Sequence, residues 1–119
     1  MSRLKLTSEI AKAAVLGGTV LGGGGGGDSQ TGIKLASLAV NFSAVELIDI
    51  NDLPEDSMLI NVSAVGAPAS KEAYAEPIYY YRAVEILRKF TDMEIKGIIT
   101  NEEGGISTVN GWLQAAMLG

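Results

Sequence analysis

The sequence predicts an α/β domain in which helices pack on a small, mostly parallel sheet. In the second half of the chain, segments with helical apolar spacing alternate with short segments rich in β-branched residues. The 119 residues are 47% hydrophobic and 19% charged, which is the balance of a globular protein able to bury a core. We therefore expect a single domain over residues 1–119, with a glycine-rich loop between two N-terminal helices.

The first expected element is a helix rich in alanine and glycine. Thr7 or Ser8 is a suitable N-cap, because a hydroxyl can accept a hydrogen bond from an unpaired backbone N–H of the first turn. Apolar residues then recur at spacings of three and four as far as about Val20. Because the residues on this face are small, we expect the helix to pack closely against another element.

Six consecutive glycines at positions 22–27 separate this helix from the next. Asp28 or Ser29 can cap a second helix over about residues 30–42. This second segment is apolar nearly all round, which is typical of a mostly buried helix.

Two strands are expected after these helices, over residues 45–50 and 58–65, because both segments are rich in β-branched and apolar residues. A dense cluster of turn-forming residues at positions 51–56 separates them. Gly66 marks the end of the second strand.

The remaining elements predict a parallel βαβ unit. Pro77 suits the first position of a helix over about residues 78–91, because the N–H that proline lacks would be unpaired there. A third strand over residues 95–100 follows this helix, so the connection is a helical crossover, and such crossovers are right-handed. Ser107 can cap a last helix that runs to the chain end.

Charge and composition exclude several classes of function. Fourteen acidic and nine basic residues give a net charge of −5, which repels phosphate backbones, so we expect no nucleic-acid partner. The chain has no cysteine and no histidine, which removes disulfides, thiolate nucleophiles, imidazole bases and the usual zinc ligands. The acidic turn at residues 49–56 lacks the spacing of a calcium loop, so we expect no metal site, and the cofactor stays open.

No segment predicts targeting to or insertion into a membrane. The basic N-terminus is followed by an apolar run that Glu9 and Lys12 interrupt, unlike a signal peptide. The uncharged run over residues 13–27 is nearly half glycine, unlike a membrane span. We therefore expect a cytoplasmic protein.

The glycine run has two interpretations. It could be a flexible linker, or a loop whose backbone approaches a ligand too closely for any Cβ and offers N–H groups at the start of the second helix. We favour the second, because both flanking helices look buried. A dinucleotide fingerprint is excluded by the helix before the run, and a phosphate-binding P-loop by Asp28-Ser29 at its end.

Two other loops follow expected strands. Gly66-Ala67-Pro68 and the loop from Glu102 to Gly105 lie at the carboxyl ends of neighbouring strands, where ligands bind in open α/β sheets. Each loop also has a simpler interpretation. The first can be an ordinary turn that ends a strand, and Glu102 in the second can be a solvated surface acid. For Tyr79-Tyr80-Tyr81 and Trp112 we favour structural roles in the core or an interface.

Several short motifs occur in an order that resembles a known family, the N-terminal domain of the DUF917 family. That family is associated with S-methyl thiohydantoin desulfurase and is often labelled hydantoinase-like. The resemblance covers essentially the whole chain. The motifs are the glycine run closed by Asp28, Asp52-Leu53-Pro54-Glu55-Asp56, Val65-Gly66-Ala67-Pro68 and Glu102-x-Gly104-Gly105.

The resemblance implies a small cyclic amide or thiohydantoin ligand held by these loops. Ser107 stands where family members typically have an asparagine, and those members continue into a second domain. We therefore expect either a fragment of a longer protein or a stand-alone half that forms a homo-oligomer or pairs with a partner chain supplying this domain. The candidate ligand-binding residues are Gly24, Gly25, Gly26, Gly27, Gly66, Ala67, Pro68, Gly104, Gly105 and Ser107.

The resulting hypothesis is a domain of an enzyme that processes a hydantoin or S-methyl thiohydantoin ring, as a hydrolase or lyase. Glycine N–H groups would stabilise a developing oxyanion, and Asp28 or Glu102 would move a proton, because the chain has no histidine. The alternative is a non-catalytic binding or oligomerisation domain that uses the glycine run for close packing.

Overall fold

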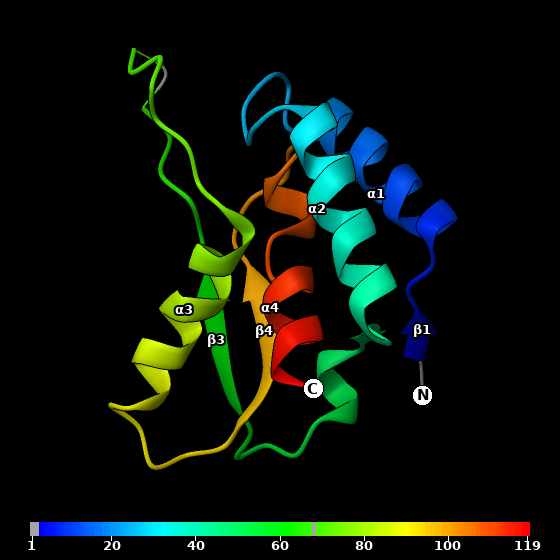
Figure 1. Ribbon diagram of the computed structural model, residues 1–119. Helices are drawn as coiled ribbons and strands as arrows, with labels where there is room; N and C mark the ends of the chain where they lie inside the picture. Colours follow the sequence, from blue (N-terminus) through cyan, green and yellow to red (C-terminus); the bar gives the residue numbers. More distant parts are fainter. Residues whose placement is uncertain (1–2, 68) are drawn as a thin grey trace.

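Helices pack around two small two-stranded sheets in the computed structural model of the chain, which describes residues 3–67 and 69–119 (Figure 1). This confirms the α/β class. The elements, including the short 3-10 helices η1 and η2, are β1 Arg3–Lys5, α1 Ser8–Leu21, α2 Ser29–Phe42, β2 Glu46–Ile48, η1 Ile50–Asp52, β3 Met58–Val62, α3 Pro77–Arg88, β4 Ile95–Thr100, η2 Ser107–Val109 and α4 Trp112–Leu118.

The main core lies between α1, α2 and α4, which pack side by side (Figure 1). Val15 of α1 and the alanines at positions 36 and 39 of α2 are fully buried, so small side chains bring these two helices close together. Leu113 of α4 and the indole of Trp112 complete the core, in agreement with a structural role for this tryptophan. The expected close packing of the first helix is confirmed.

The parallel βαβ unit is also confirmed. β3 pairs with β4 in parallel, with Ile60 opposite Ile98 and Val62 opposite Thr100, and α3 connects the two strands. Pro77 is the first residue of α3, as its missing N–H predicts.

The second sheet differs from the expectation of a mostly parallel arrangement. β1 pairs with β2 antiparallel, with Leu4 opposite Leu47, and forms a sheet separate from β3 and β4. β1 is three residues long, too short to show a periodicity in the sequence. Its pairing therefore depends on a contact across more than forty positions that no local pattern encodes.

Several expected boundaries are wrong. The strand expected over residues 45–50 ends at Ile48, because Ile50 begins the 3-10 helix η1. The expected strand over residues 58–65 ends at Val62, because its partner Thr100 is the last residue of β4 and nothing remains to pair with Val65, which is 98% exposed. The last helix begins at Trp112, because η2 precedes it and Gly111, at φ +105°, changes the chain direction.

A groove of about 400 Å³ runs between the two sheets, lined by residues of β2 and β4 that do not pair with one another. Apolar side chains line most of it, among them Ile50, Ile98 and Trp112. The Thr100 Oγ1 atom is buried on this wall with no hydrogen-bond partner among the described residues.

Because an unpaired buried hydroxyl destabilises the folded state, Thr100→Val should raise the free energy of unfolding by about 1 kcal/mol. Thr91→Val is the matched control, since the Thr91 hydroxyl donates to Met58 Sδ and accepts from the Met93 N–H, and its loss should destabilise. Urea unfolding of both variants measures the difference. A destabilised Thr100→Val would show that this hydroxyl has a partner in solution.

Candidate functional site

The glycine run forms a defined corner between α1 and α2. Gly23 and Gly24 have φ of +58° and +99°, and Gly26 and Gly27 have φ of +76° and +86°, a region that other residues rarely adopt. The Gly25 N–H donates to Gly22 O at 3.0 Å, which closes a turn inside the run. Glycine is therefore required at these positions by the backbone conformation itself.

This corner rests directly on the loop that follows β4. The Gly26 carbonyl oxygen accepts from the N–H groups of Ile106 at 2.8 Å and Ser107 at 3.0 Å. A Cβ at Gly26 would lie 2.5 Å from the Glu103 carbonyl oxygen, and one at Gly22 would lie 2.8 Å from the same atom. The two backbones thus approach more closely than any side chain permits.

Glycines on the adjoining helix and loop make the same close contact. Gly32 of α2 faces Gly105, and a Cβ on Gly32 would overlap the Gly105 carbonyl oxygen. Gly104 and Gly105 are themselves buried. The structure therefore brings the sequence-predicted residues Gly26, Gly27 and Asp28 into contact with the loop that carries Gly104, Gly105 and Ser107.

We expect Gly32→Ala to lower the free energy of unfolding by about 3 kcal/mol, because rigid backbone blocks the added methyl group. Gly17→Ala is the matched control in α1, where nothing lies within 4 Å of the added Cβ, and it should stabilise by up to about 1 kcal/mol. Urea unfolding curves of the two variants give both values. Equal effects in the two helices would contradict the close contact.

Three glycine N–H groups of the corner remain available to a ligand. The amides of Gly24, Gly26 and Gly27 donate to no residue in the described part of the chain. Unpaired N–H groups in a glycine turn next to a helix N-terminus suit a ligand atom that carries negative charge.

Asp28 is the N-cap of α2. Its Oδ1 accepts from the Thr31 N–H at 2.8 Å, and this backbone hydrogen bond lowers the pKa of the exposed Asp28 carboxyl below its usual value. A carboxylate with a lowered pKa is a weaker base. The structure thus gives Asp28 a capping role and makes it the less suitable of the two predicted proton carriers.

At neutral pH, Asp28→Ala should lower the free energy of unfolding by about 1 kcal/mol. Because the pKa is lowered in the folded state, this stabilisation is present above the unfolded-state pKa and is lost as the pH falls through the folded-state pKa. The difference between the parent chain and Asp28→Ala should therefore narrow on acidification, as measured by urea unfolding. Asp28→Asn keeps the cap without the titration, so its advantage over Asp28→Ala should not depend on pH.

The two glutamates beside the corner have different surroundings. The Ser107 hydroxyl donates to Glu102 Oε2 at a long 3.5 Å, which leaves this exposed carboxylate largely available. The Thr108 hydroxyl donates to Glu103 Oε2 at 2.6 Å and accepts from the Gly104 N–H at 3.0 Å. Sequence reasoning missed the Glu103–Thr108 pair, because no motif distinguishes Glu103 from its neighbour.

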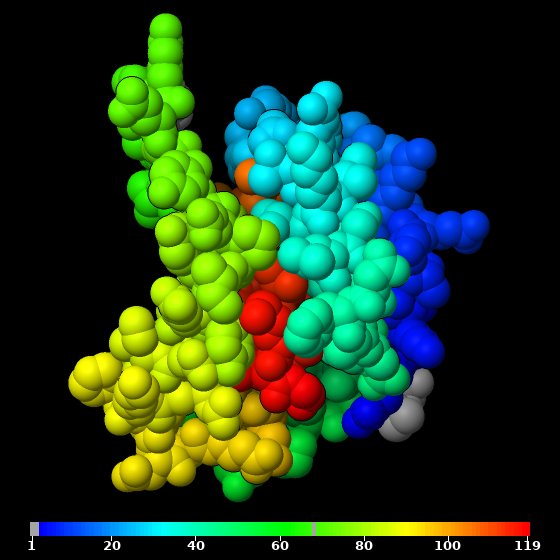
Figure 2. Space-filling view, viewed as in Figure 1, coloured from blue at the N-terminus to red at the C-terminus, as the bar shows by residue number. Residues whose placement is uncertain are grey.

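The third predicted loop lies elsewhere. Gly66 and Ala67 are exposed, and nothing lies within 4 Å of a Cβ built on Gly66. They belong to the segment between β3 and α3 that projects from the body of the molecule (Figure 2). Pro68 lies outside the described residues. The structure does not bring Gly66 and Ala67 into contact with the glycine corner.

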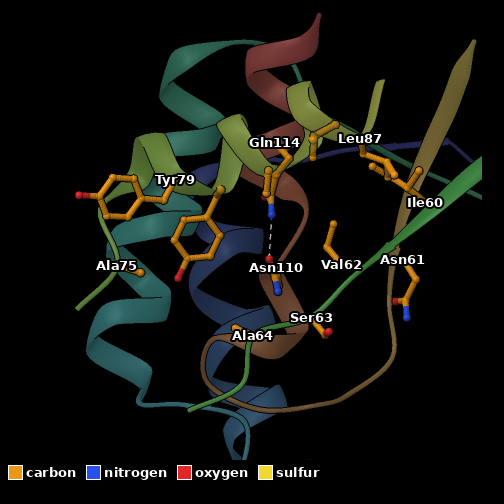
Figure 3. Close-up of a pocket in the computed structure, with 13 residues that line it drawn as sticks. Ile60, Asn61, Val62, Ser63, Ala64, Ala75, Tyr79, Leu87, Asn110 and Gln114 are labelled. Atoms are coloured by element: carbon orange, nitrogen blue, oxygen red, sulfur yellow. Dashed lines mark hydrogen bonds between the residues drawn. The ribbon is translucent and has the colours of Figure 1, made fainter. Parts of the chain in front are cut away.

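A separate cleft, which sequence reasoning also missed, lies between β3, α3 and the start of α4 (Figure 3). Two buried amides, Asn110 and Gln114, line it together with Tyr79 and Tyr80. The sequence carried no signal for it, because Asn110 and Gln114 fall in a segment expected to be an ordinary helix and its cap.

Within residues 3–67 and 69–119, no group of three or more acidic, histidine or cysteine side chains is placed to hold a metal ion. No helix in this part of the chain has both the length and the apolar character needed to cross a bilayer.

The fold and the corner define a small α/β domain in which a glycine turn is fastened to the loop after a parallel strand. A family model described as "S-Me-THD-like, N-terminal domain" matches residues 10–119. The chain therefore belongs to this S-Me-THD-like family, and the resemblance found in the sequence is confirmed. No curated protein and no solved structure matches the chain.

Proposed function

We propose that this domain is part of an enzyme that processes a hydantoin or S-methyl thiohydantoin ring, and that the glycine corner is its contribution to the active site. The observation that supports this most is that the Gly24, Gly26 and Gly27 amides have no partner among the described residues, on a turn hydrogen-bonded to the loop that carries the exposed Glu102 carboxylate. Membership of the S-Me-THD-like family supports the substrate class.

The corner suits addition to a ring carbonyl. When water attacks the carbonyl carbon, negative charge develops on the oxygen, and N–H donors held in place by the fold would stabilise that charge. The proton released by the water needs a base, which in this chain is Glu102, whose Oε2 lies 3.5 Å from the Ser107 hydroxyl. When the oxyanion collapses, the C=O bond re-forms and the ring C–N bond breaks, and the leaving nitrogen takes the proton back from Glu102. Asp28 remains the second candidate base, weaker because of its capping hydrogen bond.

We also propose that a second domain or partner chain completes this site. The family model describes an N-terminal domain, which implies a further domain in the family. The groove between β2 and β4 supports the proposal, since both strands present an edge that pairs with no other described strand there. Unpaired strand edges readily accept another extended segment.

A non-catalytic binding or oligomerisation domain is the second candidate function. The observation that favours it is that Gly22, Gly26 and Gly32 all serve close backbone packing, which needs no ligand. The two functions differ in what they require of Glu102, which takes no part in that packing.

The test is turnover of S-methyl thiohydantoin by the chain, alone and mixed with the second domain of a longer family member. Glu102→Gln should lower the rate at least 100-fold, a magnitude of about the size general-base catalysis contributes. Glu55→Gln, an exposed acid in the turn after β2, is the matched control and should leave the rate unchanged. If the folded chain gives no turnover either alone or with the second domain, the enzymatic proposal fails and the non-catalytic function is favoured.

A further inference from the structure

The cleft between α3 and β3 has a volume of about 380 Å³ and lies apart from the glycine corner (Figure 3). Side chains of Ile60 and Val62 line it from β3, and Tyr79 and Leu87 line it from α3. Asn110 and Gln114 lie between these two walls. Its size is in the range of pockets that hold small ring molecules.

The hydrogen bonds of the two buried amides fix their orientation. The Gly111 N–H can only donate, so the atom of Gln114 that it meets at 3.0 Å is the oxygen, Oε1. Gln114 Nε2 therefore donates to Asn110 Oδ1 at 2.9 Å, which leaves Asn110 Nδ2 as a donor. Asn110 is 8% exposed, and its Nδ2 has no partner among the described residues.

The charge of the cleft restricts its occupant. None of the described residues that line it is charged, and the chain carries a net charge of −5. An anion would thus lose its hydration without gaining a positively charged partner, and a cation would lose its hydration without gaining a carboxylate. A neutral molecule avoids both costs.

The walls restrict its shape. Aromatic rings of Tyr79 and Tyr80 and the aliphatic side chain of Leu87 offer apolar surface to a flat ring. Burial raises the pKa of the Tyr80 hydroxyl, so this hydroxyl stays neutral at neutral pH.

We propose that this cleft binds an uncharged, flat ring molecule that presents a carbonyl oxygen to Asn110 Nδ2. The carbonyl accepts the N–H that the fold leaves unpaired, and the ring lies against the tyrosines of α3. This inference is independent of the chemistry proposed for the glycine corner, because the two sites share no residue.

Benzamide and benzoate are suitable probes, since they have the same shape and differ in charge. Titration followed by NMR should shift the side-chain amide signals of Asn110 and Gln114 with benzamide, whereas benzoate should bind at least tenfold more weakly. Asn110→Asp replaces the donor with an oxygen, so its benzamide affinity should fall about tenfold or more. Equal binding of the two probes, or benzamide shifts confined to other residues, would overturn the proposal.

Tyr79→Ala provides a second test that leaves the buried amides in place. Removing this ring, which is 43% exposed, should weaken benzamide binding at least fivefold. Tyr74→Ala, at an exposed tyrosine that does not line the cleft, is the matched control and should leave the affinity unchanged. An unchanged affinity in Tyr79→Ala would also overturn the proposal.

Discussion

The structure depends on one contact, in which the Gly26 carbonyl oxygen accepts hydrogen bonds from the Ile106 and Ser107 N–H groups. This contact fastens the turn between α1 and α2 to the loop between β4 and α4. Since those three helices form the main core, the contact sets how they meet. A Cβ at Gly26 would separate the two backbones, which is why the glycine run cannot be replaced by an ordinary polar loop.

Close packing and ligand binding are compatible at this corner. The same turn that turns the Gly26 oxygen toward Ser107 leaves the N–H groups of Gly24, Gly26 and Gly27 without partners in the described chain. Asp28 then fixes the start of α2 through the Thr31 N–H. Whether the glycine corner serves packing alone or also binds a ligand thus depends on whether a ligand contacts these unpaired amides and Glu102.

Features encoded by neighbouring residues could be predicted from the sequence. At each of the first two helix starts, one of the two predicted caps is the N-cap, Thr7 for α1 and Asp28 for α2, and Pro77 takes its predicted place at the start of α3, because these features depend on local hydrogen bonding. The β1–β2 pairing and the Asn110–Gln114 cleft could not be predicted, because each is created by segments that meet only in the fold. The local propensities of a short polar segment do not indicate which distant segment of the chain it will contact in the fold.

The loops that follow β3 and β4 were expected to meet at one crevice. They lie at two separate places for a topological reason. Val62 and Thr100 are paired at the carboxyl ends of β3 and β4, but the chain leaves them in different directions. After Thr100 it passes Glu102 toward the glycine corner, whereas after Val62 it passes through the wall of the cleft. The 3-10 turn of η2, closed by the Asn110 N–H to the Ser107 oxygen at 3.2 Å, joins the corner to the cleft. One short segment therefore positions the polar groups of both sites.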